Sequence, residues 1–395
     1  MNIVYYLSSF PKLSESFVLN EICELVQNGH NVAVCALNKP DENIVHEEFN
    51  ELDIPINYIR TPSFTDVTEL FSTEALHPRI LKNAFYRAPP KHHAGNLFRA
   101  KQCIKFVDSL CWEPDLFHSH FVGLSRFGVQ YASEYYQIPL TITAHAIDLY
   151  KEPVGVYMST LLQRANRIVT ISKYNKDHIK KNFASDTPID IVRAGIRPEK
   201  FAPTEGTEPN RLLTISRFVE KKGLPYALEA VKIATEEIPE LEYHIIGSGD
   251  LKSNLVQKVE QLGIDENVVF LDNVSDQRLV TELDEARCFL LPCVIAESGD
   301  RDGIPVALME AMAMKTPPVS TTVSGIPELI DHEQNGLLTE PRNPEATSEA
   351  IVSLFEAGSD WTAYAEHARE KVVAEFNIEK EAEKLEATFR SSQYN

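Results

Sequence analysis

The sequence predicts two doubly wound α/β domains, and three observations support this prediction. The chain has 395 residues, more than one ordinary hydrophobic core requires. Short apolar runs alternate with helix-period segments on both sides of a polar stretch at 204–210. Most of these runs are apolar throughout, as parallel strands are when helices cover both faces of their sheet. Alternation of strands and helices on two sides of a linker is typical of two doubly wound sheets.

The first half begins with a strand and a helix. The strand is predicted at Ile3–Leu7, and the helix after it has Val18, Ile22 and Leu25 on one face. Gly29 ends that helix. Later strands of this half are predicted at Val32–Leu37, Leu140–Thr143, Ile168–Ile171 and Ile189–Arg193. We therefore expect a first domain over 1–203 and a linker at 204–210.

The second half repeats this pattern and ends in helices. Leu224, Leu228, Val231 and Ala234 form an apolar stripe on a helix that Pro225 opens at a first-turn position. Strands are predicted at Leu212–Ile215, Tyr243–Ile246, Val268–Leu271, Cys288–Leu291 and Pro318–Thr321. The second domain is expected over 211–375. A final helix is expected over 376–395. This helix could pack against the first domain.

Composition narrows the class of protein. The formal net charge of −20 argues against general nucleic-acid binding, which needs a basic face. The six cysteines lack zinc-site spacing, which favours a reducing cytoplasm. The first residues lack a basic leader and are predicted to form a strand rather than a signal peptide. No apolar run approaches the ~20 residues that span a bilayer. We expect a cytoplasmic protein that can bind a membrane surface but does not span the bilayer.

The most informative motif is the segment 297–313. A polar, acid-rich loop follows a strand here, and Pro305 opens a helix where its missing N–H costs nothing. A helix N-terminus of this kind favours a phosphate group. Asp302 stands before the helix and Glu310 in its second turn, so both carboxylates can face one ligand. The alternative is a capping aspartate with a solvated glutamate, although Glu310 lies in a largely apolar helix.

Three weaker motifs also follow predicted strands. Arg217 and Lys222 lie on one loop and could grip a diphosphate, although a solvated basic loop is the alternative. The glycines of Gly247-Ser248-Gly249 fit a tight turn as well as ligand contact. His145 with Asp148, and the segment His118-Ser119-His120, could orient a sugar hydroxyl or be structural.

Taken together, these stretches resemble the family 4 retaining glycosyltransferases of the GT-B fold. In that fold two Rossmann-like domains face each other across a cleft. The resemblance runs nearly end to end and is nearest to the branch that builds bacterial exopolysaccharides such as colanic acid. It is carried by Phe10–Phe17, His145 with Asp148, Ile171-Ser172, Ala194-Gly195-Ile196, Arg217–Gly223, Gly247–Gly249, Asp302–Ala313, Gly325–Glu328 and Asn335–Leu338.

The resemblance implies a role for each matching position. Glu310 would hold the donor ribose, and Asp302 would contact the transferred sugar with help from the amides of Gly303 and Ile304. Arg217 and Lys222 would neutralise the donor diphosphate in place of a metal, so neither a metal nor a cofactor is expected. The remaining assignments are His145 near the reacting sugar, Gly247 in the donor site, and Leu271 and Asn273 near the base.

Two departures from the family pattern affect these roles. The first acid of the paired-glutamate motif is Asp302, which is one methylene shorter than the usual glutamate. The glycine-rich loop after the first strand is also absent. Lys12, Ser14 and Asp148 are therefore the candidates for an acceptor or phosphate loop in the first domain.

The resemblance implies retaining transfer of a sugar to a glycan or a lipid-diphosphate-linked acceptor. The expected donor is a UDP-sugar, with a GDP-sugar as the alternative. Closure of the domains would bring His145 and the acceptor over the donor. Two other functions fit the same fold: a nucleotide-sugar epimerase or hydrolase, and a non-catalytic subunit that binds nucleotide sugar.

The stretch 75–107 stands out because it contains no acidic residue in an acidic chain. Anionic headgroups attract such a segment, and aromatic side chains could enter the interface beside them. We expect salt-sensitive binding to the inner face of the plasma membrane, lost when Arg87, Lys91, Arg99 and Lys101 become Glu. A basic surface helix is the alternative. The cations of the stretch are Arg79, Lys82, Arg87, Lys91, Arg99, Lys101 and Lys105, and its aromatic residues include Phe85, Tyr86 and Phe98.

Overall fold

The computed structural model divides the chain into two compact units. Unit 1 contains 1–171, 175–193 and 378–395, and unit 2 contains 172–174 and 194–377. Each unit is described separately below. The structure describes residues 1–12, 15–40, 47–59, 78, 90–150, 155–183, 186–204, 206–272, 274–358 and 360–393.

Unit 1 is built on a seven-stranded parallel sheet with the order β3-β2-β1-β4-β5-β6-β7. The strand order changes direction between β1 and β4, and ligands of doubly wound sheets bind beyond the carboxyl ends of strands at such a point. The strands are β1 (Asn2–Ser9), β2 (Asn31–Asn38), β3 (Ile56–Tyr58), β4 (Leu116–His120), β5 (Leu140–Ala144), β6 (Arg167–Thr170) and β7 (Ile189–Ile191).

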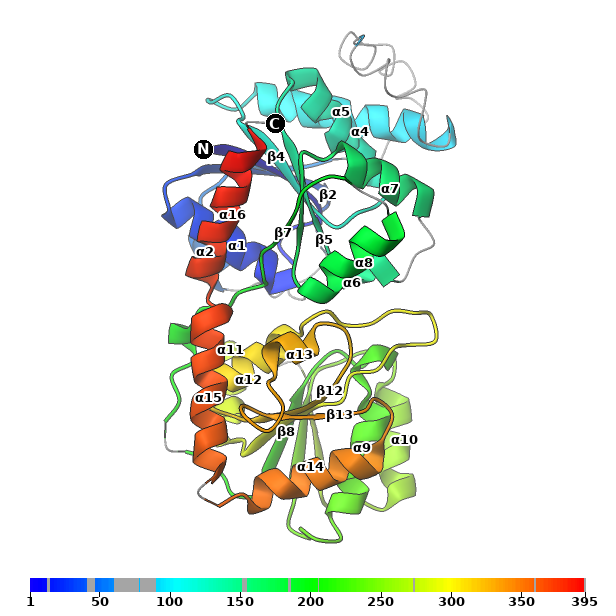
Figure 1. Ribbon diagram of the computed structural model, residues 1–395, viewed down its shortest axis with the longest axis vertical. Coiled ribbons are helices and arrows are strands. Elements are labelled where there is room, and N and C mark those ends of the chain that lie inside the picture. Colours follow the sequence, from blue (N-terminus) through cyan, green and yellow to red (C-terminus); the bar gives the residue numbers. More distant parts are fainter. Residues whose placement is uncertain are drawn as a thin grey trace. The chain divides into compact units, whose positions relative to one another are not determined.

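Helices cover both faces of this sheet (Figure 1). Along β1, Tyr5 packs with Leu19 and Phe389 on one face, while Tyr6 packs with Ile104 and other residues on the other. Every inward position of β1 is therefore buried, which explains its continuous apolar sequence. The helices of unit 1 are α1 (Ser16–Gln27), α2 (Glu47–Glu51), α4 (Pro90–Asp108), α5 (Phe127–Tyr136), α6 (Ala146–Tyr150), α7 (Gly155–Arg164), α8 (Lys173–Phe183) and α16 (Ile378–Ser392).

The last helix, α16, lies beside α1 in Figure 1. Its Phe389 and Leu385 are fully buried in the core that α1 also covers. Asn28, at the end of α1, donates a hydrogen bond of 2.9 Å to Glu386 Oε1. The chain therefore returns to unit 1 after completing unit 2.

Unit 2 repeats the architecture with a six-stranded parallel sheet in the order β10-β9-β8-β11-β12-β13. Its strand order changes direction between β8 and β11, which puts the candidate binding edge at the carboxyl ends of those strands. The strands are β8 (Arg211–Ile215), β9 (Glu242–Ile246), β10 (Val268–Leu271), β11 (Cys288–Leu291), β12 (Pro318–Thr321) and β13 (Leu337–Thr339).

Two apolar clusters lie on the two faces of the unit 2 sheet. Leu212 and Leu290 belong to the cluster under α9, α10 and α14, whereas Leu213 and Leu291 belong to the other. Burial on both sides again accounts for the continuous apolar strands. The helices are α9 (Leu224–Ala234), α10 (Lys252–Leu262), α11 (Asp276–Glu285), α12 (Val306–Ala313), α13 (Ile326–Leu329), α14 (Pro344–Glu356) and α15 (Asp360–Glu375).

The division between the units differs from the predicted one. The chain passes from unit 1 to unit 2 after Arg193, ahead of the predicted boundary at 203. Ile196 and Phe201 pack in the core of unit 2, and the polar stretch 204–210 is attached to α11 rather than linking two units. Thr204 N donates to Asp284 Oδ1 at 2.7 Å, and Glu208 N donates to Glu285 O at 2.8 Å. Polar composition alone did not reveal these contacts.

Among the described parts of the chain, no helix combines the length and the apolar character needed to cross a bilayer.

Candidate functional site

Two loops at the direction change of the unit 2 sheet are joined to each other. The loop after β8 carries Lys221, and the loop after β11 spans 292–305. Val294 N donates to Lys221 O at 2.9 Å, and Glu297 N donates to Glu220 Oε1 at 2.8 Å. Gly223 has φ +69°, and a Cβ there would lie 1.9 Å from the carbonyl oxygen of Pro292. Only glycine leaves room for this approach, and the absence of a Cβ at Gly223 therefore lets the two loops pack against each other.

These loops carry a cluster of opposite charges around Asp302. Lys222 Nζ lies 2.7 Å from Asp302 Oδ2, and Lys221 Nζ lies 3.4 Å from Oδ1. Lys221 also contacts Asp300 at 3.2 Å, and Cys293 Sγ donates to Asp302 Oδ2 at 3.5 Å. Burial by itself raises the pKa of Asp302, but Lys222 and Lys221 outweigh burial and lower it to about 2. The loops thus hold an ionised acid between two ammonium groups.

Arg217, the other predicted diphosphate contact, lies on the same loop. Its side chain is exposed, and it forms no ion pair with the residues that the structure describes. Lys222 is less exposed, and its pKa is raised because Asp302 outweighs the opposing effects of burial and of the Arg217 charge. The structure therefore brings Arg217, Lys222 and Asp302 together, with Lys222 already engaged by the acid.

Glu310 lies in the second turn of α12, whose N-cap is Pro305. Its carboxylate forms no hydrogen bond or ion pair with any residue in the described part of the chain. Burial raises the pKa of Glu310 to about 7, with Asp276 raising it further and Lys200 opposing them. A half-buried carboxylate that loses hydration without gaining a partner is destabilised, which is the reason to expect that a ligand supplies the partner.

The remaining predicted donor contacts of unit 2 lie at strand ends. Gly247 N donates to Leu271 O at 3.1 Å, so the ends of β9 and β10 meet there. A Cβ on Gly247 would lie 1.9 Å from the carbonyl oxygen of Ser216. Gly303 and Ile304 are buried directly before α12. Asn273 lies outside the described residues.

In unit 1, His145 follows β5 and is buried. Its backbone N–H donates to Asp148 Oδ2 at 3.0 Å, which gives Asp148 a local capping role. The ring centroid of His145 lies 5.0 Å from that of Phe17 and 4.5 Å from that of Phe121. Burial, followed by the neighbouring His120, lowers the pKa of His145 well below its ordinary value. His145 is therefore uncharged at neutral pH.

The two other candidates of unit 1 lie beyond the end of β1. Lys12 Nζ forms an ion pair of 2.7 Å with Glu15 and is 38% exposed, so its charge is partly compensated but accessible. Ser14 lies outside the described residues. Neither observation identifies a phosphate contact in this loop.

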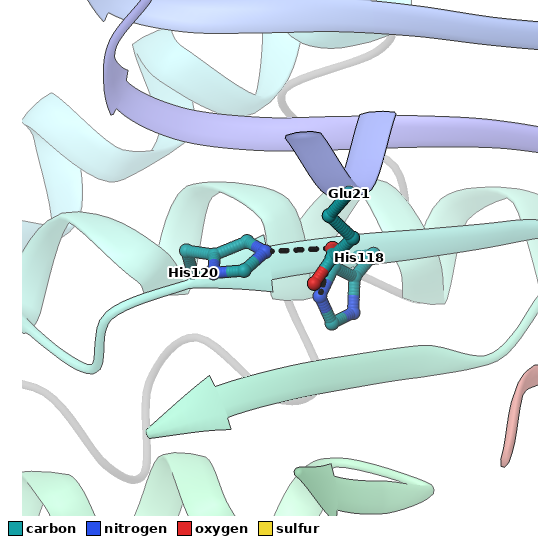
Figure 2. A group of neighbouring side chains, drawn as sticks. All are labelled: Glu21, His118 and His120. Carbon is teal, nitrogen blue, oxygen red and sulfur yellow. Dashed lines mark hydrogen bonds and ion pairs between the residues drawn. The ribbon is translucent and has the colours of Figure 1, made fainter. Parts of the chain in front are cut away.

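Next to His145 lies a buried cluster that Figure 2 shows: Glu21 from α1 with His118 and His120 from β4. Glu21 Oε1 lies 2.9 Å from His120 Nε2 and 3.7 Å from His118 Nε2. Tyr5 donates its hydroxyl proton to the same oxygen at 2.6 Å. His120 Nδ1 in turn lies 3.0 Å from His145 Nε2.

By distance alone, Glu21, His118 and His120 could hold a metal ion, because their ligand atoms lie within 4.8 Å of one another. Hydrogen bonds account for these atoms, however. His118 Nδ1 lies 2.7 Å from Thr141 Oγ1, and His118 Nε2 lies 3.1 Å from Thr143 Oγ1. Metal binding would displace the contact of Tyr5 with Glu21 and that of Thr143 with His118, and Tyr5 and His118 are fully buried. The donor set therefore fits a hydrogen-bonded network better than a metal centre.

Within the described part of the basic stretch 75–107, some side chains that were predicted to face a membrane are buried. Phe98 and Lys101 are 1% and 5% exposed, so neither is available to a membrane. They belong to the inner side of α4, where Ala100, Cys103 and Ile104 join the core. Lys105 is exposed, Arg99 is partly buried, and Arg87 lies outside the described residues, as do Phe85 and Tyr86.

Two family models match the chain one after the other. The Glycosyltransferase Family 4 model matches residues 14–200, and the Glycosyl transferases group 1 model matches residues 196–371. The first covers most of the unit 1 sheet. The second covers the loops that carry Arg217 and Asp302 and the helix that carries Glu310. The chain is a glycosyltransferase with a family 4 domain followed by a group 1 domain.

Curated relatives align with this glycosyltransferase over nearly its whole length. The amylovoran biosynthesis glycosyltransferase AmsK of Erwinia amylovora is 28% identical over 95% of the chain and 96% of its own length. The putative colanic acid biosynthesis glycosyltransferase WcaL of Escherichia coli K12 is also 28% identical, with the same shares covered.

Solved structures show the fold. A glycosyltransferase from Rickettsia africae has a TM-score of 0.75 at 16% identity and covers 100% of this chain and 99% of its own. Anabaena HepE in complex with UDP and glucose has a TM-score of 0.75 at 15% identity, covering 98% and 99%. The two-domain GT-B fold expected from the sequence is confirmed.

Several residues near the predicted site residues were not predicted from the sequence. Lys221 is a second ammonium on Asp302, and its place beside Lys222 was the available signal. The hydroxyls of Ser216 and Ser324 are buried and have no hydrogen-bond partner among the described residues; Ser216 directly follows β8 and Ser324 follows β12. Glu21 gave no signal, because its contact with His120 joins residues far apart in the chain.

Proposed function

We propose that this glycosyltransferase transfers a sugar, with retention of anomeric configuration and without a metal ion, from a nucleotide-diphosphate sugar to a glycan or lipid-linked acceptor. The observation that carries the proposal is the cluster of Lys221, Lys222 and Asp302 before the N-terminus of α12, with Arg217 exposed on the same loop as the two lysines. Cations and unpaired amides gathered at one strand edge suit a diphosphate.

Each group has one task in this mechanism. Negative charge develops on the leaving diphosphate, and Arg217, Lys222 and the start of α12 stabilise it. Asp302 and the amides of Gly303 and Ile304 contact the transferred sugar, and the unpaired Glu310 accepts hydrogen bonds from the ribose. His145 is the residue of unit 1 that this mechanism assigns to the reacting sugar. The acceptor hydroxyl attacks the face that the diphosphate leaves, which retains the configuration.

Lys222 gives the donor site a specific response to ligand. In the unliganded protein its ammonium group is paired with Asp302 at 2.7 Å. A diphosphate offers a stronger, doubly charged partner, so donor binding would divide Lys222 between phosphate and acid. Protein cations then do what a divalent ion does in other transferases.

For the donor we propose a UDP-sugar, with a GDP-sugar as the alternative. Anabaena HepE, which shares the fold, is described in complex with UDP-glucose. The names of the relatives from Erwinia and Escherichia point to exopolysaccharide biosynthesis as the process. The acceptor would then be a growing glycan on a lipid diphosphate, at the cytoplasmic face of the membrane.

A donor panel tests this proposal. UDP-, GDP- and ADP-sugars are screened by thermal shift, since a bound donor raises apparent stability. Transfer to lipid-linked acceptors is then measured, and NMR reads the anomeric configuration of the product. Hydrolysis or epimerisation of donor without acceptor would identify the chain as one of the alternative enzymes. Donor binding without any turnover would identify a non-catalytic subunit.

Arg217→Ala tests the diphosphate contact. One charge-assisted hydrogen bond is worth roughly 1.5–3 kcal/mol, so donor binding should weaken about ten- to a hundredfold. Lys232→Ala is the matched control, because Lys232 lies in the last turn of α9, at the opposite end from Lys222. Activity that persists in a chelator fits protein cations, whereas strict dependence on Mg²⁺ or Mn²⁺ contradicts the metal-free mechanism.

A further inference from the structure

A chain of hydrogen bonds inside unit 1 leads from α1 to the candidate residue His145. Glu21 Oε1 lies 2.9 Å from His120 Nε2, and His120 Nδ1 lies 3.0 Å from His145 Nε2 (Figure 2 shows Glu21 and His120). His120 is 1% exposed, so water does not compete for these bonds. The family match assigns no task to Glu21 or His120.

The chemistry of Glu21 sets the direction of these bonds. An ionised carboxylate only accepts hydrogen bonds, so His120 must donate its Nε2–H to it. A neutral imidazole then has an unprotonated Nδ1, which can only accept. The proton between the two rings therefore belongs to His145 Nε2.

A doubly protonated His120 ring would reverse the second bond and leave His145 protonated on Nδ1. The position of the His120 ring is fixed through its backbone. The fully buried Arg126 donates to the carbonyl oxygen of His120 through Nε at 3.1 Å and through Nη2 at 3.0 Å. The ring assignment described below separates the two protonation forms.

The ring of His145 is held in place from several sides. Phe17 and Phe121 lie 5.0 and 4.5 Å away by ring centroid, and the ring of His120 lies edge to edge with that of His145 at 5.3 Å, with 23° between the two planes. His145 Nδ1 forms no hydrogen bond with a residue in the described part of the chain. A ring packed in this way, with its Nε2 engaged by His120, has Nδ1 left to contact a ligand.

We propose that Glu21 and His120 are positioning residues that hold His145 in its neutral Nε2–H form, so that its Nδ1 acts as a hydrogen-bond acceptor. The matching ligand chemistry is a hydroxyl group, such as those of a sugar, and not a carboxylate or phosphate oxygen. The consequence for catalysis rests on the proposed function, whereas the tautomer itself does not.

NMR of the full chain, labelled with ¹⁵N in the histidine rings, tests the tautomer directly. The His145 signals are assigned by their loss in His145→Gln. We expect Nε2 to show the shift and coupling of a protonated nitrogen and Nδ1 those of an unprotonated one, unchanged from about pH 6 to about pH 8. A protonated Nδ1, or averaging between both forms, overturns the proposal.

Matched variants of His120 separate positioning from packing. His120→Phe keeps an aromatic ring between Tyr5 and His145 but removes both nitrogens, so the His145 tautomers should begin to exchange. His120→Asn retains an acceptor near the place of Nδ1 and should restore the single form. His118→Asn is the control on the same face of β4, since His118 bonds Thr141 and Thr143 rather than His145.

Transfer kinetics complete the test. His120→Phe should lower kcat about tenfold with little change in the KM of the donor, and His120→Asn should recover most of it. Equal activity in both variants overturns the positioning role. If the wild type transfers no sugar while His145 shows the expected tautomer, the proposed function fails and the positioning network stands. The purified protein is also analysed for metal. If it contains stoichiometric metal whose removal shifts the His118 and His120 signals, the cluster is a metal site and the proposal is wrong.

Discussion

Asp302 and Glu310 are carboxyl groups of the same unit whose surroundings move their pKa values in opposite directions. Both lose hydration on burial, which raises the pKa of each. Asp302 has Lys222 and Lys221 beside it, and its pKa falls to about 2. Glu310 lacks such a partner, and its pKa rises to about 7. Two acids eight residues apart in sequence are thus prepared for different partners.

We expect Glu310→Gln to change the pH dependence of stability. A carboxyl with a raised pKa favours the folded state fully below its unfolded pKa of about 4.5, and this advantage is lost as the pH rises to about 7. Between about pH 5 and pH 8, the wild type should lose up to about 3 kcal/mol of unfolding free energy relative to the variant. Urea unfolding at a series of pH values measures this difference.

The same variant should bind nucleotide less tightly, because the amide cannot replace the carboxylate as acceptor for two ribose hydroxyls. Calorimetry with free nucleotide measures the loss. Parallel stability curves for wild type and variant would show that Glu310 is not held in a desolvating environment.

Asp302→Asn should behave differently. The lowered pKa of Asp302 contributes stability above its unfolded pKa of about 3.8, lost as the pH falls through about 2. The variant should therefore be less stable at neutral pH by about 2 kcal/mol. Nucleotide binding should not weaken, because Lys222 is released for the diphosphate, while transfer should fall. If both acid variants weaken free nucleotide equally, the proposed division between sugar and ribose is wrong.

At the scale of elements, the relative position of the loops after β8 and β11 depends on one close backbone contact. The loop after β8 and the loop after β11 share the hydrogen bond from Val294 to Lys221 and the approach of Gly223 to Pro292. Neighbouring strands β8 and β11 bring the loops together, and glycine lets the backbones touch. The position of the cations relative to Asp302 follows from this contact.

A pair of glycine variants isolates the contact. Gly223 and Gly263 have similar left-handed φ values of +69° and +62°, but a Cβ on Gly263 would meet nothing within 4 Å. Gly263→Ala should cost only the backbone strain, about 1–2 kcal/mol. Gly223→Ala should cost about 1–3 kcal/mol more and weaken donor binding, since the loop must move. Chemical unfolding and donor calorimetry compare the two; equal behaviour would contradict the importance of the contact.

At the scale of the whole molecule, the charge is strongly acidic except in the stretch 75–107. The net charge of −20 repels an anionic membrane, so any attraction must be local. The burial of Lys101 and Phe98 removes two residues from the predicted membrane surface. Arg79, Lys82, Arg87, Lys91, Arg99 and Lys105 remain its candidate cations.

We expect the protein to co-sediment with anionic vesicles at low salt and to be released at high salt, because each cation near the surface contributes ~1 kcal/mol. Arg87→Glu with Lys91→Glu should abolish this binding and leave donor binding unchanged. Lys180→Glu with Lys181→Glu is the control, since both lysines are exposed at the end of α8. Wild type that stays in the supernatant at low salt would favour a soluble acceptor.

The sequence was sufficient for properties that depend on local patterns. Parallel strands buried on both faces must be apolar throughout, so strands such as those at Leu212–Ile215 and Cys288–Leu291 were predicted close to their observed bounds. The short edge strands β3 and β13 were missed, because three residues give too weak a pattern. The cations and acids of the candidate donor site were predicted because they lie on segments that follow strands.

Only the tertiary structure decided which of these groups meet. The units divide after Arg193 because Ile196 and Phe201 pack into the second core, a choice that depends on contacts far along the chain. The engagement of Lys221 and Lys222 with Asp302, and of Glu21 with His120, likewise joins residues from different elements. Local sequence sets the period and polarity of an element, whereas partners across a sheet edge are fixed by strand order and packing.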